Sequence, residues 1–131
     1  MPAAESEAAA RRMFEAFARS DGFALRGLFA DEAVWIVPGD GVMAGTYHGR
    51  DAIFRFLARL PEETDGTYTS ELIDVMASDE RAAALYRARG TRRGRRLDLD
   101  QLLLLRVEGG LVRSVLALPS DAAAFEAFWA P

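Results

Sequence analysis

Hydrophobic residues recur along this chain with two different periods, one helical and one typical of strands. Over residues 4–19 they return every three or four positions, which places them on one face of an α-helix. The same spacing predicts a short helix capped by Asp21, a helix over residues 50–60 that Pro61 ends, and a last helix that begins near residue 121. The apolar face of the first helix consists of Ala10, Met13, Phe14 and Phe17.

Alternating apolar and polar positions predict strands over residues 33–37, 67–77 and 111–118. Two further strands are predicted to form a long hairpin over residues 81–107. Residues 39–49 are rich in glycine, and they are predicted to be an irregular loop.

The hairpin has one register that keeps its two faces distinct. If Arg93 faces Gly94, residues whose numbers sum to 187 lie opposite one another. A shift of one residue would place arginines opposite leucines, so the charge pattern determines the register. One face then carries two directly opposed ion pairs, Arg87 with Asp100 and Arg89 with Asp98.

The other face of the hairpin is apolar except for one polar pair. Tyr86 lies opposite Gln101, while Ala84 lies opposite Leu103. This face is expected to form the floor of a pocket, and the charged face is expected to point away from it.

The order of elements is helix, helix, strand, helix, four strands and helix, which is typical of an α+β fold. A curved, mainly antiparallel sheet wrapped around helices makes a cone-shaped α+β barrel with an apolar cavity between its layers, the usual kind of site for a small molecule. A chain of 131 residues with 50% hydrophobic content suits a single domain over residues 1–131.

Charge and composition exclude several classes of partner. The formal net charge of −4 argues against nucleic acid and against an anionic membrane surface. There are no cysteines, which excludes disulfides, thiolate catalysis and cysteine metal sites. No apolar run reaches the length of a membrane span and the N-terminal stretch lacks the basic start of a signal peptide, so a cytoplasmic location is expected.

Several segments of the chain form a recognisable pattern: residues 28–39 (LFADEAVWIVPG), 44–47 (AGTY), 49–53 (GRDAI), 71–81 (ELIDVMASDER) and Phe128-Trp129. This pattern resembles the SnoaL-like branch of the nuclear transport factor 2 superfamily. The resemblance implies a cone-shaped cavity, no metal or organic cofactor, and a homodimer packed through the outer face of the sheet. It does not imply one activity, because the fold hosts polyketide cyclases, ketosteroid isomerases, epoxide hydrolases and non-catalytic binders.

The catalytic residues of two related enzyme classes have no match here. The base, tyrosine and acid of the ketosteroid isomerases align with Val37, Met13 and Leu103, which cannot move or donate a proton. The aspartate–arginine–aspartate cluster of limonene-type epoxide hydrolases would have to come from the hairpin face opposite Tyr86. Histidine positions that recur in SnoaL-like members align with Ile36, Ile73 and Leu103. We therefore expect a cavity with few polar groups.

Four residues remain as candidates for catalysis: Tyr86, Gln101, His48 and Asp40. His48 is the one histidine, in a loop that is expected to form the cavity mouth, where Asp40 can orient it. The alternative is an exposed loop histidine with no role. For Tyr86 and Gln101, the alternative is a pair that only satisfies its own hydrogen bonds in an apolar interior.

The expected ligand-contacting wall is apolar and rich in aromatic side chains. Because aromatic residues at helical spacing are more often plain core, Trp35 and Trp129 are the stronger candidates to hold a planar ligand. The full set of expected contact residues is Met13, Phe17, Trp35, Val37, Phe54, Leu103, Val115, Phe125 and Trp129.

Two other surfaces have an interpretation from the sequence. The arginines at the hairpin tip, Arg92, Arg93, Arg95 and Arg96, are interpreted as a solvated turn rather than an anion site. On the outer face, Leu85, Leu102 and Leu104 form an apolar patch that is costly to leave in water, so burial in a homodimer is expected. The alternative is a helix or tail that folds over this face.

Two function classes follow. The first is a cofactor-independent cyclase, isomerase or dehydratase that acts on a hydrophobic, carbonyl-bearing, polyketide-like molecule, and it is slightly preferred. The second is a non-catalytic protein that binds an apolar small molecule. The missing carboxylates favour the second class, and the activities common in the family favour the first.

Overall fold

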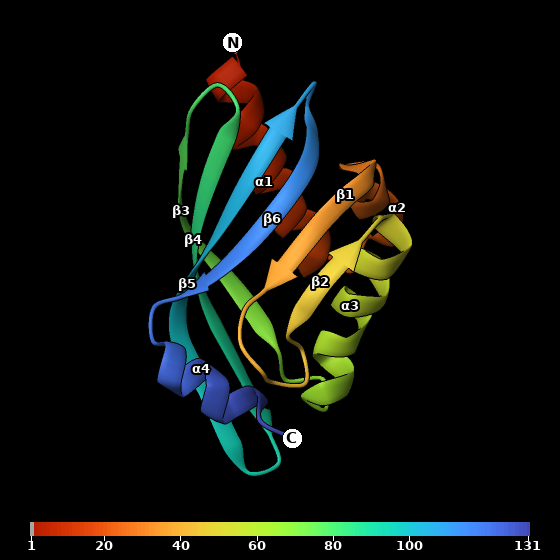
Figure 1. Cartoon of the computed structure of the whole chain (residues 1–131). Coiled ribbons are helices and arrows are strands. Elements are labelled where there is room, and N and C mark those ends of the chain that lie inside the picture. The colour runs from red at the N-terminus through yellow and green to blue at the C-terminus, as the bar shows by residue number, and fades with distance from the viewer. Residues whose placement is uncertain (1) are drawn as a thin grey trace.

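The computed structural model describes residues 2–131, which form four helices and one six-stranded sheet (Figure 1). The strand order is β2-β1-β6-β5-β4-β3, and every neighbouring pair is antiparallel except β1 and β6. The strands are β1 (Phe29–Val37), β2 (Gly45–His48), β3 (Thr69–Ala77), β4 (Arg81–Arg92), β5 (Arg95–Glu108) and β6 (Leu111–Pro119).

The helices close the inner side and one end of the curved sheet. The long helix α1 (Pro2–Ala18) contacts β3, β4 and β5, and it passes behind the sheet in Figure 1. The short helix α2 (Gly22–Arg26) follows it, α3 (Arg50–Glu63) contacts β1 and β2, and α4 (Ala122–Trp129) contacts β5. This arrangement confirms the α+β fold class with a curved sheet around helices.

The hairpin of β4 and β5 has the register that its charges predict. Its pairs run from Arg81 opposite Arg106 to Arg92 opposite Arg95. Arg93 and Gly94 both have positive φ, 50° and 75°, which suits the type I′ turn of a two-residue hairpin. The expected ion pairs are present, and the Arg87 guanidinium also reaches the neighbouring Asp98 at 2.8 Å.

Three predictions along the chain differ from the structure by three or more residues. Residues 45–48 are a strand because they pair with β1, which supplies the hydrogen bonds that the glycine-rich sequence alone does not indicate. The strand predicted over residues 33–37 begins earlier, at Phe29, because Phe29 already pairs with Val112 of β6. Pro61 lies inside the last turn of α3, because its fixed φ fits a helix and only one N–H is lost.

Candidate functional site

Two small apolar cavities lie between the sheet and the helices, each with a volume of about 40 Å³. The first extends toward α1 and α2, and the second extends toward α4. No carboxylate, imidazole or cationic side chain lines either cavity among residues 2–131. The wall that both cavities share consists of Trp35, Leu60, Tyr68, Tyr86 and Leu103.

The main polar pair at these cavities is Tyr86, which lies on the shared wall, and Gln101, which lines the second cavity. They lie opposite one another on β4 and β5, and the Tyr86 hydroxyl donates to Gln101 Oε1 at 2.7 Å. Each residue is only 4% exposed. Burial raises the pKa of Tyr86 well above its ordinary value, so the phenol is a hydrogen-bond donor and not a base at neutral pH.

Two further polar side chains extend this pair toward the surface. Tyr68 lines both cavities, and Ser70 lines the first of them. Burial of the hydroxyl raises the pKa of Tyr68, although the residue as a whole is half-buried. Tyr68, Ser70, Tyr86 and Gln101 thus form a row of polar side chains that runs from the start of β3 across β4 to β5.

Sequence reasoning missed Tyr68 and Ser70. The signal was present, because Tyr68, Ser70 and Leu72 recur at two-residue spacing, which places them on one face of a strand. Leu72 lies opposite Tyr86, so this face is the inner one. A bulge between Leu72 and Asp74 then interrupts the alternation within the predicted strand.

Most of the predicted contact residues line the inner cavities: Met13, Phe17, Trp35, Val37, Leu103, Phe125 and Trp129. Two do not. Phe54 lines an open cleft outside the cavities, and Val115 is fully buried in the core of the sheet without reaching a cavity.

His48 and Asp40 lie away from the cavities. His48 is exposed on β2 opposite Val34, whereas its neighbour Tyr47 pairs with the cavity residue Trp35. Because adjacent side chains of a strand point to opposite faces, the imidazole is directed away from the interior. Asp40 is exposed, and its backbone N–H donates to Glu126 of α4 at 3.0 Å.

The loop before β2 packs on α4, and its Met43 lines the second cavity. The Val42 N–H donates to Trp129 O at 2.8 Å, and Arg59 of α3 donates to Val42 O at 3.2 Å. A Cβ on Gly41 would lie 2.7 Å from Trp129 Cβ, so glycine is required for this close approach. The mouth at residues 39–49 stays a prediction.

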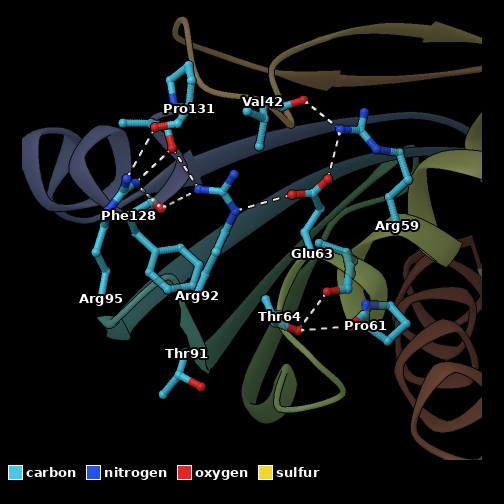
Figure 2. Close-up of polar contacts among 12 residues, drawn as sticks. Val42, Arg59, Pro61, Glu63, Thr64, Thr91, Arg92, Arg95, Phe128 and Pro131 are labelled. Carbon is cyan, nitrogen blue, oxygen red and sulfur yellow. Dashed lines mark hydrogen bonds and ion pairs between the residues drawn. The ribbon is translucent and has the colours of Figure 1, made fainter.

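Two arginines at the hairpin tip hold the end of α4 (Figure 2). Arg92 is 4% exposed, pairs with Glu63 at 3.2 Å and donates to Ala130 O at 2.6 Å. Arg95 donates to the carbonyls of Phe128 and Ala130 at 3.2 and 2.7 Å. Cations suit these last carbonyls, which carry the negative end of the helix dipole. The interpretation as a solvated turn is therefore wrong for these two side chains.

The outer face of the sheet carries a broad apolar patch. Leu85, Leu102 and Leu104 are each half-buried on it, and no helix or tail within residues 2–131 covers them, which removes that alternative. Ile36 and Ile73, aligned above with histidine positions, are 36% and 52% exposed and do not line the cavities. Met76 and Leu118 also belong to the outer patch, and they are 54% and 40% exposed.

Neither a cluster of metal-ligand side chains nor a helix of membrane-spanning character occurs among the described residues. Between residues 2 and 131, no three histidine, cysteine, aspartate or glutamate side chains gather as metal ligands would. None of the helices in that range is long and apolar enough to cross a membrane.

Comparisons with known proteins place these features in context. The sequence profile of the SnoaL-like domain matches residues 10–115. An uncharacterized protein of Mycobacterium tuberculosis is 38% identical over 121 residues, which cover 92% of each chain. Bal32a, from a soil-derived mobile gene cassette, has a TM-score of 0.94 and 32% identity over 98% of this chain and 99% of that chain. A protein of unknown function from Xanthomonas campestris has a TM-score of 0.87 and 27% identity, over 94% and 96% of the two chains.

Proposed function

Since this chain belongs to the SnoaL-like domain family, we propose that its interior binds a neutral, hydrophobic, carbonyl-bearing small molecule. The observation that carries the proposal is the buried pair of Tyr86, which lies on the wall shared by two apolar cavities, and Gln101, which lines the second cavity. A few placed polar groups in an apolar lining orient a ligand. The absence of charged lining residues favours a neutral ligand, because an ion there would remain unpaired.

In the catalytic form of this proposal, the protein is a cofactor-independent cyclase, isomerase or dehydratase of polyketide-like substrates. The family includes polyketide cyclases and ketosteroid isomerases, which supports this class of chemistry. Tyr86 then donates a hydrogen bond to the carbonyl oxygen while negative charge develops on it. The apolar walls fix the orientation of the carbonyl end, which lowers the entropic part of the barrier.

A non-catalytic binding protein is the second candidate, and one observation favours it directly. Enolisation and aldol cyclisation both require a group that accepts a proton from carbon. His48 and Asp40 lie outside the cavities, and the phenols of Tyr68 and Tyr86 remain protonated at neutral pH. Binding needs only shape, burial and the polar pair.

The rate at which protons next to a carbonyl exchange with solvent distinguishes the enzyme from the non-catalytic binding protein. The protein is incubated in D₂O with acetophenone, a neutral aryl ketone, and deuterium in its methyl group is followed by NMR while calorimetry measures binding. Exchange that is faster with the native protein than with Tyr86→Phe supports the enzyme. Binding without accelerated exchange supports the binder, and the absence of binding by a panel of neutral ketones contradicts both.

We also propose that the apolar outer patch binds a second copy of this chain. The patch crosses several strands, since Leu102 lies between Leu85 and Leu118, and Leu104 lies opposite Leu116, which in turn pairs with Ile36. A twofold axis through a face of this kind brings one patch onto the same patch of the partner. The large exposed residues at its margins support burial rather than contact with water.

A further inference from the structure

The inner cavities are too small for a whole ligand of the proposed class. Each has a volume of about 40 Å³, whereas pockets for small molecules occupy roughly 300–1,000 Å³. One water-sized probe needs about 10–15 Å³, so each cavity holds only a few non-hydrogen atoms. A ligand that reaches Tyr86 therefore places only a narrow end there, and its body must lie elsewhere.

An open cleft of about 710 Å³ lies directly outside the first cavity. It is bounded by the end of α1, by α2, by α3 and by the start of β3. Its size is that of a small-molecule site. Its apolar surface comes mainly from Phe17, Leu25, Phe54, Leu57, Ala58 and Tyr68.

The cleft and the first cavity adjoin one another, because they share lining residues. Phe17 and Tyr68 stand at this junction, with their rings edge to face and 6.3 Å apart. Ser70 adds a hydroxyl at the same place. The shared residues are Phe17, Leu25, Leu57, Tyr68 and Ser70.

The charge of the cleft restricts the ligand further. No lysine or arginine lines it within residues 2–131, so a phosphate or carboxylate would find no cationic partner. The one charged lining residue is Asp21, whose carboxylate already accepts the Ala24 N–H at 3.0 Å as the cap of α2. The cleft is therefore suited to the uncharged body of a ligand.

We infer that the ligand is a neutral, elongated ketone whose body lies in this cleft and whose narrow carbonyl end enters the first cavity past Phe17 and Tyr68, toward Tyr86. The inference rests on the proposed function and adds the shape class of the ligand. It excludes compact ligands whose carbonyl belongs to a wide fused ring, because such a ring cannot enter a cavity of about 40 Å³. Phe17 and Tyr68 then determine which carbonyl ends are accepted.

A series of 2-alkanones tests this arrangement. Calorimetry with 2-pentanone, 2-octanone and 2-undecanone is expected to show tighter binding with each added methylene, by about fourfold while the chain fills the cleft. In Ala58→Arg, the large side chain lies on the exposed rim of the cleft and not in the cavities. This variant is expected to remove most of the increase in affinity with chain length. Its affinity for 2-pentanone is expected to stay within about twofold of the native value.

Ala123→Arg is the matched control, because Ala123 is an exposed helical alanine outside the cleft. It is expected to keep the native dependence on chain length. Native affinity that does not change with chain length, or an Ala58→Arg effect equal for all three ketones, contradicts the inference while 2-pentanone binding still supports the proposed function. Failure of every ketone to bind contradicts the proposed function itself.

Discussion

The Tyr86 hydroxyl and the Gln101 carbonyl oxygen are joined by a 2.7 Å hydrogen bond across β4 and β5. Both groups are buried, and the wall that carries Tyr86 separates two apolar cavities. The bond uses the acceptor of the amide and leaves its N–H groups as donors. A carbonyl ligand can therefore be held by an amide N–H or by the phenol after a small rearrangement of the pair.

Removing one member of this pair is expected to affect both stability and binding. Tyr86→Phe leaves the buried Gln101 oxygen without its donor, which is expected to cost about 1–3 kcal/mol of unfolding free energy. The double variant with Gln101→Leu removes both polar groups, so it is expected to be less destabilised than the sum of the single variants. Urea denaturation of the four proteins measures this coupling, and strictly additive losses would contradict it.

The same variants are expected to weaken acetophenone binding by about 2–10-fold, the value of one hydrogen bond. Tyr47→Phe is the matched control, because its hydroxyl donates to Met43 O at 2.7 Å and lines neither cavity. It is expected to lower stability without changing ketone affinity. Equal affinities of the native and Tyr86→Phe proteins would remove Tyr86 from the proposed site.

Glu63→Gln is expected to loosen the attachment of α4. The substitution removes the carboxylate that faces Arg92, whose guanidinium is nearly buried. The Arg92 guanidinium is then left with only backbone carbonyls as partners, which is expected to lower the free energy of unfolding by about 2 kcal/mol. Glu62→Gln is the control on the same helix, because Glu62 is exposed and makes no ion pair within the described residues. Thermal unfolding of both variants tests this, and equal midpoints would contradict it.

The ion pair also predicts a dependence of stability on pH. Partial burial opposes ionisation of Glu63, but hydrogen bonds from Arg92 and Arg59 outweigh it and lower the pKa below 4.5. The unfolded chain binds a proton at Glu63 more tightly than the folded protein does. The contribution of ionised Glu63 to the free energy of unfolding is therefore complete above pH 4.5 and is lost as the pH falls through the folded-state pKa. Denaturation across pH 6 to 3 is expected to show a shallower decline for Glu63→Gln than for the native protein, and parallel declines would refute this role.

Gly41→Ala is expected to separate the loop at residues 39–44 from α4. The added Cβ would lie 2.7 Å from Trp129 Cβ and 2.9 Å from Trp129 O, so one segment must move. Overpacking of this kind costs about 1–3 kcal/mol. Gly22→Ala is the control, because a Cβ there meets nothing within 4 Å. If the two variants unfold at the same denaturant concentration, the close approach at Gly41 is not structurally important.

The outer patch predicts a dimer that a single charge disrupts. Leu102→Asp places a carboxylate at the centre of the apolar surface, and it is expected to convert a dimer into a monomer in sedimentation velocity. Thr91→Asp is the control, because Thr91 is exposed near the hairpin tip, away from the patch. A native protein that is monomeric at micromolar concentration would contradict the proposed interface.

The sequence by itself determined the features that depend on local periodicity and on pairs of adjacent strands. The spacing of apolar residues predicted each helix. The opposed arginines and aspartates of residues 87–100 predicted the hairpin register, because one shift would have placed charges against leucines. The inner position of Tyr86 and Gln101 follows from that register, so the centre of the candidate site could also be predicted.

Only the tertiary structure decided the features that depend on segments distant in the chain. β2 exists because β1 offers it hydrogen bonds, and its pairing turns His48 away from the interior. Arg92 is buried because the end of α4, 36 to 38 residues further on, brings its carbonyls to the hairpin tip. The size of the cavities follows from how α1, α3 and α4 pack on the sheet, which no local pattern encodes. Periodicity shows which face of an element is apolar, and packing between elements determines how much space remains there.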